Sequence, residues 1–315
     1  MNGVVEAPSR WELLEGAVKG MGKKYSQDRC TAQRTADGHA VVLAVADGHG
    51  SAPHFRSDLG AAWAVQEFAA CAGEFVNGAV RHAAAAEQQG DETLWWTALS
   101  ELRAEARRLP QQVAHRWYRR AVLHDCNSPA QGGVPHGDGG GRTGDERPET
   151  GAKALDLTPC GSTLVGAVLT RRLLVCWQLG DGDVVVLDGS GTAHTPLYTG
   201  PDLGDETDSL CESEAWRRVR CHWQPLTGEG PAGLLLSTDG LSKSFTDHQG
   251  FLDFATGVRD RAAEHGTPVV RERLPAWLGH AAQYSGDDTT LVGALAAAPQ
   301  LDDAAPTQAT RGTPW

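Results

Sequence analysis

The stretch VVLAVADGHGSAPHF, residues 41–55, begins as a buried strand and ends in a polar turn. Its first six residues are all apolar, and a short apolar run that stops at turn residues is typical of a fully buried strand. The strand then delivers the carboxylate of Asp47 and the imidazole of His49, with Gly48 between them. An Asp-Gly pair is also a common hairpin turn, because glycine accepts positive φ. The choice between a turn and a functional site depends on whether other carboxylates stand at other strand ends.

Strand and helix patterns occupy separate parts of the chain. Strand-like apolar runs lie at residues 11–19, 41–46, 162–169, 173–179, 183–189, 218–223, 233–238 and 290–296. Two long helical patterns cover about 58–87 and 92–124, and we expect Pro110 to kink or divide the second. Further helical material is expected around 251–283. Because the elements do not alternate as regular βαβ units, the pattern predicts an antiparallel α+β fold.

The chain is predicted to form a single domain over residues 1–296. About 127–152 is so rich in Gly and Pro that we expect a mobile surface insertion there. Residues 297–315 are expected to be a disordered tail.

Composition narrows the class of partner. Forty Asp and Glu against 28 Lys and Arg give a net charge of −12, which disfavours nucleic acids and anionic membranes, since both are bound mainly through cations. The start lacks a basic region followed by an apolar stretch, and no later run of 18 apolar residues is present, so we expect neither secretion nor membrane insertion. The seven cysteines include no CxxC pair, so we expect them to be reduced thiols. We therefore expect the protein to be cytoplasmic.

Further carboxylates share the character of Asp47, because each lies where an apolar run begins or ends. They are Asp28, Asp181, Asp239, Asp287 and Asp288. Mg²⁺ and Mn²⁺ prefer such oxygen ligands, and two ions about 4 Å apart can share a hydroxide that attacks a phosphoryl group. The chain has no G-x-S-x-G, Walker A or H-E-x-x-H motif. The pattern therefore favours metal-assisted hydrolysis.

Five ordered motifs carry a family resemblance. They are DGHGS (47–51), GSTLVGAVL (161–169), LGDGDVVVL (179–187), STDGLSKSF (237–245) and GDDTTLVG (286–293). In this order they resemble the metal-dependent Ser/Thr protein phosphatases of the 2C family, and the wording is most similar to bacterial members. The resemblance covers about residues 15–295. The resemblance implies a central antiparallel β-sandwich flanked by helices on both faces, with two Mg²⁺ or Mn²⁺ ions at one end. It also implies hydrolysis of phosphoserine and phosphothreonine by a hydroxide that bridges the ions.

The resemblance assigns the metal ligands residue by residue. Asp47 matches the carboxylate that bridges both ions, and the carbonyl of Gly48 matches a ligand of the second ion. Asp239 and Asp287 match ligands of the first ion. Asp28 matches the acidic residue that holds water on the second ion.

Other site residues follow from the same resemblance. His49 matches the proposed general acid that protonates the departing seryl or threonyl oxygen. Lys23 stands where the family has a phosphate-binding arginine, and a lysine lacks the bidentate fork of arginine. Gln27 replaces a glutamate near the second ion, so we expect weaker occupancy there, and Asp288 is expected beside the ligands.

A weaker third ion is implied at Asp181 together with Asp239. Lys243 occupies the position of an acidic residue near that ion, so the third site is in doubt whereas the two-ion site is intact.

Three functional hypotheses remain after the sequence is considered. The first is a phosphatase whose substrates are proteins phosphorylated by a Ser/Thr kinase. The second is a catalytically weak or silent scaffold that binds phosphoproteins, to which Lys23, Gln27 and Lys243 lend weight. The third is a metal-dependent phosphodiesterase acting on nucleotides, which the acidic charge and the family pattern disfavour.

Overall fold

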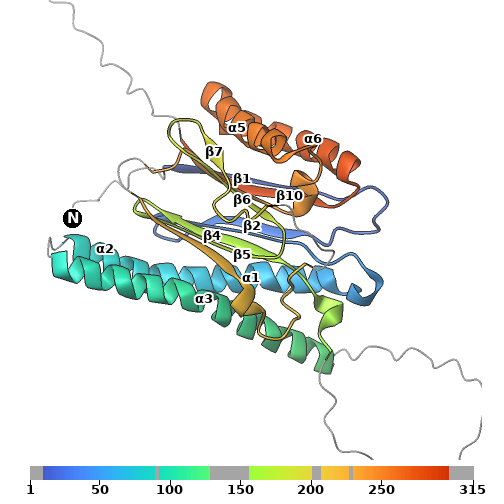
Figure 1. Ribbon diagram of the computed structural model, residues 1–315, viewed down its shortest axis with the longest axis horizontal. Coiled ribbons are helices and arrows are strands. Elements are labelled where there is room, and N and C mark those ends of the chain that lie inside the picture. The colour runs from blue at the N-terminus through green and yellow to red at the C-terminus, as the bar shows by residue number, and fades with distance from the viewer. Residues whose placement is uncertain (1–9, 89–91, 128–155, 201–206, 227–229, 298–315) are drawn as a thin grey trace, which may run out of the picture.

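The structure is a computed structural model that describes residues 10–88, 92–127, 156–200, 207–226 and 230–297. At its centre two five-stranded antiparallel sheets face each other (Figure 1). The first sheet has the order β1-β10-β9-β6-β7, formed by Trp11–Val18, Thr289–Ala296, Gly233–Ser237, Asp183–Leu187 and Ala193–His194. The second sheet has the order β2-β3-β4-β5-β8, formed by Arg29–Arg34, Ala40–Ala46, Leu164–Thr170, Leu173–Leu179 and Arg220–Pro225.

Helices cover the outer face of each sheet. The helices are α1 (Ser57–Phe75), α2 (Arg81–Gln88), α3 (Glu92–Asn127), α4 (Asp239–Ser242), α5 (His248–His265) and α6 (Thr267–Ser285), and a π-helical turn at Val76–Val80 joins α1 to α2. Helices α5 and α6 lie on the first sheet, and α1 and α3 lie on the second (Figure 1). The predicted α+β class, with helices on both faces of a sandwich, is confirmed. None of the described helices combines the length and the apolar character that crossing a bilayer requires.

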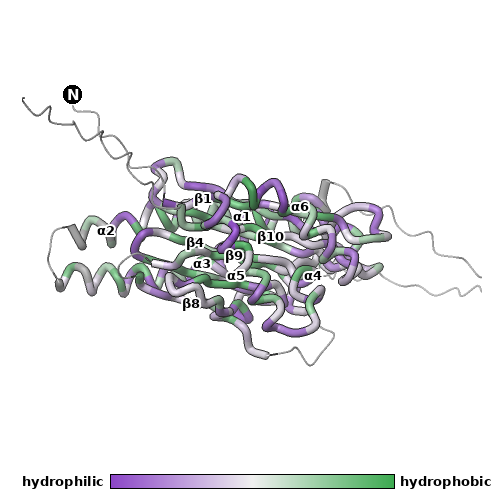
Figure 2. Tube along the Cα trace, turned by 90° about the horizontal axis from the view of Figure 1, so that it is seen from above, coloured by the Kyte–Doolittle hydropathy of each residue, from purple (hydrophilic) through white to green (hydrophobic). Residues whose placement is uncertain are grey.

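The position of strand β3 explains why its sequence is apolar at every residue. All seven of its residues are buried, and successive side chains of a strand point to opposite faces. Val41, Leu43 and Val45 pack between the two sheets. Val42 and Ala44 pack against the helices on the outer face. A strand covered on both sides needs apolar residues at every position. The hydropathy colouring shows apolar residues concentrated among the strands in the middle of the molecule (Figure 2).

Helix α3 continues through Pro110, so the division that we expected there as an alternative to a kink does not occur. Proline cannot donate a hydrogen bond to the carbonyl four residues earlier, which in α3 is that of Ala106. The indole Nε1 of Trp177 on β5 donates to this carbonyl at 2.8 Å. The sheet therefore supplies the hydrogen bond that Pro110 takes from the helix.

Replacing Trp177 with phenylalanine tests this arrangement. The buried carbonyl of Ala106 would lose its donor, so the free energy of unfolding should fall by about 1–3 kcal/mol. In a Pro110→Ala background the new amide of residue 110 can donate to the same carbonyl, and Trp177→Phe should then cost about 1 kcal/mol less. Chemical denaturation of the four proteins measures both values. An equal cost in the two backgrounds would show that the indole hydrogen bond contributes nothing.

The C-terminal helical region predicted around 251–283 consists of two helices. They separate at Gly266, whose φ of 85° is readily adopted only by glycine.

The short strand β7 was not predicted. The expected insertion at 127–152 and the tail at 297–315 fall almost wholly outside the described residues.

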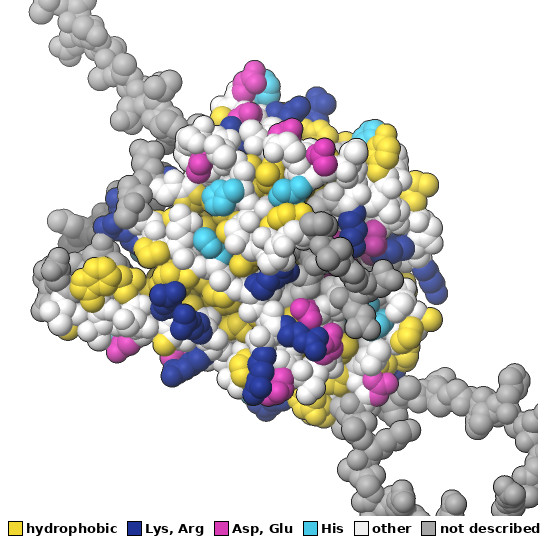
Figure 3. All heavy atoms as spheres, viewed as in Figure 1, with side chains coloured by type: hydrophobic (Ala, Val, Ile, Leu, Met, Phe, Trp, Pro, Cys, Tyr) yellow, Lys and Arg dark blue, Asp and Glu magenta, His cyan; other side chains and the backbone are white. Residues whose placement is uncertain are grey.

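Basic side chains gather on the lower part of the face seen in Figure 3, over α3 and the neighbouring strand β8. Several of the arginines on α3 are already paired. Arg116 binds Glu74 at 2.7 Å, and Arg120 binds Glu67 at 2.5 Å, with both acceptors on α1. These two arginines therefore link α3 to α1 at the surface.

Candidate active site

In the second sheet, the strand register brings three of the predicted carboxylates to one edge. Arg29 at the start of β2 pairs with Ala46 at the end of β3, so Asp28 and Asp47 are neighbours just beyond this pair. The start of β4 pairs with the end of β3 on one side and with the end of β5 on the other. Asp181, two residues after β5, therefore lies at the same edge.

The first sheet brings its carboxylates to the corresponding edge. Ser237 at the end of β9 pairs with Leu291 near the start of β10 and with Asp183 at the start of β6. Asp239 begins α4 directly after β9, and Asp287 lies just before β10. Antiparallel neighbours thus place one strand's end beside the next strand's beginning, which gathers residues distant in the chain.

The two edges meet around Asp47. Burial raises the pKa of Asp47 well above its usual value, and the negative charges of Asp28, Asp239 and Asp287 add to this effect. Thr238, directly after β9, donates its hydroxyl to Asp28 Oδ2 at 2.7 Å and so ties one sheet to the other. The four carboxylates that the sequence singled out as ligands of a two-ion site are thus brought together.

Asp28 is the most enclosed partner of Asp47. It is 4% exposed, and burial raises its pKa to about 6. Contact between the two carboxyl groups further raises the pKa of Asp47 and lowers that of Asp28. A second negative charge beside a buried carboxylate is unfavourable, which is why the charge of Asp28 raises the pKa of Asp47.

The backbone around Asp47 is held by Thr163, which directly precedes β4. Its amide donates to the hydroxyl of Thr163 at 3.0 Å, and its carbonyl accepts from the Thr163 amide at 2.8 Å. Gly48 then passes so close to Ser57 at the start of α1 that an added Cβ would lie 2.7 Å from backbone atoms of Ser57. The glycine after Asp47 is therefore required by close packing, which the turn interpretation alone does not explain.

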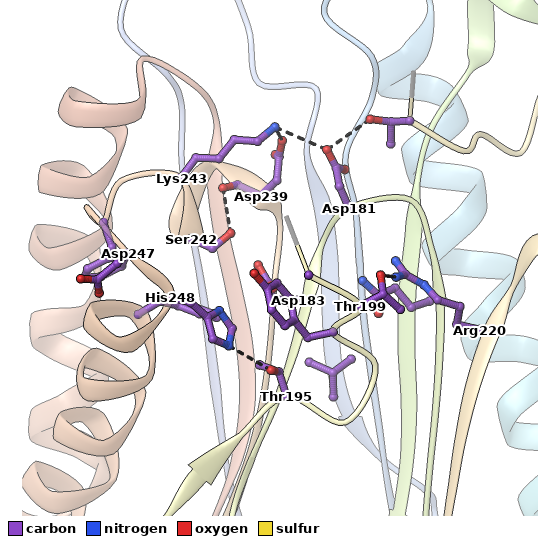
Figure 4. Close-up of a pocket in the computed structure, with 17 residues that line it drawn as sticks. Asp181, Asp183, Thr195, Thr199, Arg220, Asp239, Ser242, Lys243, Asp247 and His248 are labelled. Carbon is purple, nitrogen blue, oxygen red and sulfur yellow. Dashed lines mark hydrogen bonds and ion pairs between the residues drawn. The ribbon is translucent and has the colours of Figure 1, made fainter. Parts of the chain in front are cut away.

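Asp181 and Asp239 face each other across the gap between the sheets, with the ammonium of Lys243 bound to both (Figure 4). The Nζ atom of Lys243 lies 3.4 Å from Asp181 Oδ2 and forms a close ion pair with Asp239 Oδ2. Burial and the charge of Asp181 raise the pKa of Asp239, and Lys243 acts in the opposite direction. Burial tends to lower the pKa of Lys243, but the Asp239 and Asp181 carboxylates outweigh it, so its pKa is raised.

Lys23 binds the acidic pair that precedes β10. Its ammonium forms a close ion pair with Asp287 and lies 3.3 Å from Asp288 Oδ2. Asp288 is 1% exposed and also accepts from the amides of Gly20, at 2.8 Å, and Gln27, at 2.7 Å. Asp288 therefore holds the loop that carries Lys23 and Gln27 against the site.

The side chain of Gln27 braces the loop that follows β3. Its Nε2 donates to the carbonyl of His49 at 3.0 Å and to the hydroxyl of Ser57 at 2.6 Å. The side-chain amide of Gln27, which stands where the family has a glutamate, is thus hydrogen-bonded within the protein. The weaker occupancy of the second ion that we expected from this replacement stays a prediction.

His49 is placed beside the cluster, with its amide donating to the carbonyl of Gly161 at 3.3 Å. Burial, helped by the neighbouring His54, lowers the pKa of its imidazole to about 4. The two rings meet edge to face with centroids 4.7 Å apart. At neutral pH the ring is uncharged, which is less suited to a general acid than an imidazole titrating near 7. The predicted role of His49 stays a prediction.

A cavity of about 600 Å³ opens beside Asp181 and Asp239. Its wall includes Asp183 and His248 (Figure 4). The ring of Tyr198, which also lines the cavity, stacks on that of His248 with centroids 4.2 Å apart. The cavity adjoins the carboxylates, so a molecule bound at the cluster has room to extend into it.

The chemistry of the cluster suits a hard divalent cation. Asp28 Oδ1 and Asp239 Oδ1 are buried, and no amide, hydroxyl or ammonium group of the described residues donates to them. Buried carboxylate oxygens without a donor are costly, and a cation with oxygen ligands satisfies them. Within the described ranges, no three His, Cys, Asp or Glu side chains are already arranged to hold a metal ion. Lys23 binds Asp287 of this cluster, so side chains would have to shift to surround an ion there.

Three contributors to the site were not singled out from the sequence. Thr163 anchors Asp47, Thr238 anchors Asp28, and Asp183 lines the cavity. All three lie within the quoted motifs GSTLVGAVL, STDGLSKSF and LGDGDVVVL. Their polar side chains inside otherwise apolar motifs were the feature of the sequence that could have identified them.

Comparison with known proteins supports the same architecture. The family model described as Protein phosphatase 2C matches residues 21–279. No curated protein matches the sequence. A bacterial serine phosphatase bearing a point mutation is 14% identical, with a TM-score of 0.54 over 92% of this chain and 100% of the other.

Two further solved structures have a similar fold. The serine/threonine phosphatase of S. agalactiae is 13% identical, with a TM-score of 0.52 over 90% of this chain and 99% of the other. A sex determining protein of C. elegans is 16% identical, with a TM-score of 0.55 over 93% of this chain and 66% of the other. At these identities the likeness shows the fold, and the family model matches most of the chain. The chain therefore belongs to the protein phosphatase 2C family.

Proposed function

We propose that this protein removes phosphate from phosphoserine and phosphothreonine side chains of other proteins with the help of two divalent cations, Mg²⁺ or Mn²⁺. The observation that carries the proposal is the convergence of Asp28, Asp239 and Asp287 on Asp47 from both sheets. Two of the buried carboxylate oxygens there still lack a donor, which is the condition that a cation relieves. Membership of the 2C family supports the same reaction.

The residues that would hold the ions are Asp47, Asp28, Asp239, Asp287 and the carbonyl of Gly48. When bound, such ions act as Lewis acids on a phosphoryl oxygen and make a coordinated water acidic. The protein contributes the placement. Thr163 fixes the backbone of Asp47, so the carboxylate on which both ions depend is held on a rigid strand end.

The remaining residues act on the substrate. Lys23 is proposed to bind the phosphate, because its ammonium stands at the edge of the cluster with 23% of its side chain exposed. His49 is proposed to donate a proton to the departing oxygen, which requires that substrate binding raise its pKa from about 4. The adjacent cavity has room for residues that flank the phosphorylated side chain. The substrates would be the products of a Ser/Thr kinase.

A second candidate function is a silent scaffold that binds phosphoproteins. The observation in its favour is that Lys23 and Lys243 already bind Asp287, Asp288, Asp181 and Asp239. In that case the ammonium groups would replace the metal charge permanently, and phosphopeptide would bind without being hydrolysed.

Hydrolysis of a phosphothreonine peptide with and without divalent cations tests the proposal. We expect phosphate release with Mn²⁺ or Mg²⁺ and loss of it with excess EDTA, because the carboxylates alone repel a phosphate. Restoring Mn²⁺ should restore the rate. A cyclic nucleotide serves as the control substrate and should be hydrolysed far more slowly.

The scaffold gives a different result in the same assay. Calorimetry would then show phosphopeptide binding with and without Mn²⁺, and no phosphate would be released under any condition. That outcome would overturn the phosphatase proposal in favour of the scaffold.

A further inference from the structure

Lys243 joins two carboxylates of the cluster that come from distant parts of the chain. Asp181 lies in the turn from β5 of the second sheet to β6 of the first, and Asp239 follows β9 of the first. The ammonium of Lys243 contacts Oδ2 of both carboxylates (Figure 4). The side chains of Asp181 and Asp239 are only 16% and 8% exposed, so their charges are poorly screened by water.

The backbone holds Lys243 in position for this contact. Its amide donates to the carbonyl of Asp239 at 2.9 Å, which completes the turn of α4. The lysine therefore leaves the helix on the same side as Asp239, four residues earlier. The charged end reaches the carboxylates from the solvent side, with 61% of the side chain exposed.

The two carboxylate oxygens of Asp239 have different surroundings. Its Oδ2 atom binds Lys243, while its Oδ1 atom is buried and receives no hydrogen bond from an amide, hydroxyl or ammonium group of the described residues. The charge of Asp239 also raises the pKa of Asp47, so Asp239 borders the centre of the cluster as well. One oxygen is thus neutralised from within the protein, and the other remains available for a cation beside Asp47.

We propose that the ammonium of Lys243 is a built-in cation that fills the space between Asp181 and Asp239 and excludes a divalent ion from this pair. The inference rests on the proposed function, because it assumes that divalent ions bind at Asp47. A cation between two carboxylates repels a second cation at the same place, and the lysine cannot diffuse away as an ion can. The protein then works with the ions at Asp47 and needs no further ion at Asp181.

Lys23 is not equivalent to Lys243. It contacts Asp287 and Asp288, which are consecutive residues of one loop. Lys23 therefore does not connect carboxylates from distant parts of the chain, as Lys243 does.

Counting bound Mn²⁺ by isothermal titration calorimetry tests the inference. Lys243→Met removes the charge but keeps most of the stem, so we expect it to bind one more Mn²⁺ per chain than the parent, at a weaker site. Lys243→Arg keeps a cation and should match the parent. Lys24→Met removes the charge of an exposed lysine elsewhere in the protein and should also match it.

A double variant locates the additional ion. In Lys243→Met the extra Mn²⁺ should depend on Asp181, so adding Asp181→Asn should return the count to that of the parent. Thermal unfolding gives a second measurement, because an ion that binds only the folded protein raises its midpoint. The midpoint should rise more steeply with Mn²⁺ in Lys243→Met than in Lys243→Arg.

The outcomes separate the inference from the proposed function. Equal, non-zero counts in the parent and Lys243→Met would overturn the inference and leave the proposed function standing. Absence of Mn²⁺ binding in every variant would overturn both. Since Lys243 is largely exposed, the variants should fold, and Lys243→Gln replaces the methionine variant if that protein is insoluble.

Discussion

Replacing Asp47 with asparagine is expected to lower kcat/KM for a phosphothreonine peptide by about 10³-fold or more. The substitution keeps the shape of the side chain and removes the charge on which both cations depend in the proposed site. Asp47 lies where the charges of Asp28, Asp239 and Asp287 converge, so no neighbouring carboxylate can take its place. Steady-state phosphate release at saturating Mn²⁺ measures the effect.

Asp253→Asn provides a matched control for the loss of a carboxylate. Asp253 is exposed on α5 and should retain the parental rate. If Asp47→Asn kept more than about a tenth of the parental kcat/KM, the assignment of Asp47 as the central ligand would be wrong, since removing even one stabilising group at such a site costs about 10²-fold.

The same variant should be more stable than the parent when no metal is present. Burial raises the pKa of Asp28 to about 6 and that of Asp47 well above its usual value. A carboxyl with a raised folded-state pKa favours folding while it is protonated, and this stability is lost as the pH rises through the folded-state pKa. The metal-free parent should therefore lose stability between about pH 4 and pH 7. Asp47→Asn should lose less, and thermal unfolding in EDTA compares the two.

Replacing Lys23 with methionine is expected to lower kcat/KM by about thirtyfold, which corresponds to about 2 kcal/mol for a charged hydrogen bond to phosphate. The ammonium is the cation proposed to meet the phosphate, and methionine keeps only the apolar stem. Lys23→Arg should retain or improve the rate, because the guanidinium offers two parallel donors to a phosphate. Initial rates over a range of phosphopeptide concentrations measure kcat/KM.

Lys24→Met is the control here as well, since it removes the adjacent positive charge from an exposed position. Parental kinetics for Lys23→Met would mean that Lys23 serves only as a partner of Asp287 and Asp288. A loss of structure is distinguished from a loss of phosphate binding by Lys23→Arg, which keeps the ion pairs in either case.

Much of the fold could be predicted because its strands are buried on both faces. The run at 41–46 became β3, and the other apolar runs became strands within a few residues of their expected limits. Pro110 was harder to interpret. Its effect on α3 depends on the indole of Trp177, which lies 67 residues further along the chain and meets the helix only in the folded protein.

The carboxylates of the candidate site could be selected from the sequence because each stands at a strand end. The resemblance to the 2C family then distinguished Asp47 from an ordinary Asp-Gly turn. The partners of these groups could not be selected in this way. Thr163 and Thr238 flank strands without any distinguishing pattern, and only the fold places their hydroxyls against Asp47 and Asp28.

The sequence by itself determined the layers of this protein and the acidic residues at their edges, because apolar periodicity and motif order are local properties of the chain. Only the tertiary structure decided the charge balance of the site. It placed Lys243 between Asp181 and Asp239, placed Lys23 against Asp287, and buried Asp28 beside Asp47, which raises the pKa of both. Electrostatic energies depend on distance and burial, and both are set by the way the two sheets face each other.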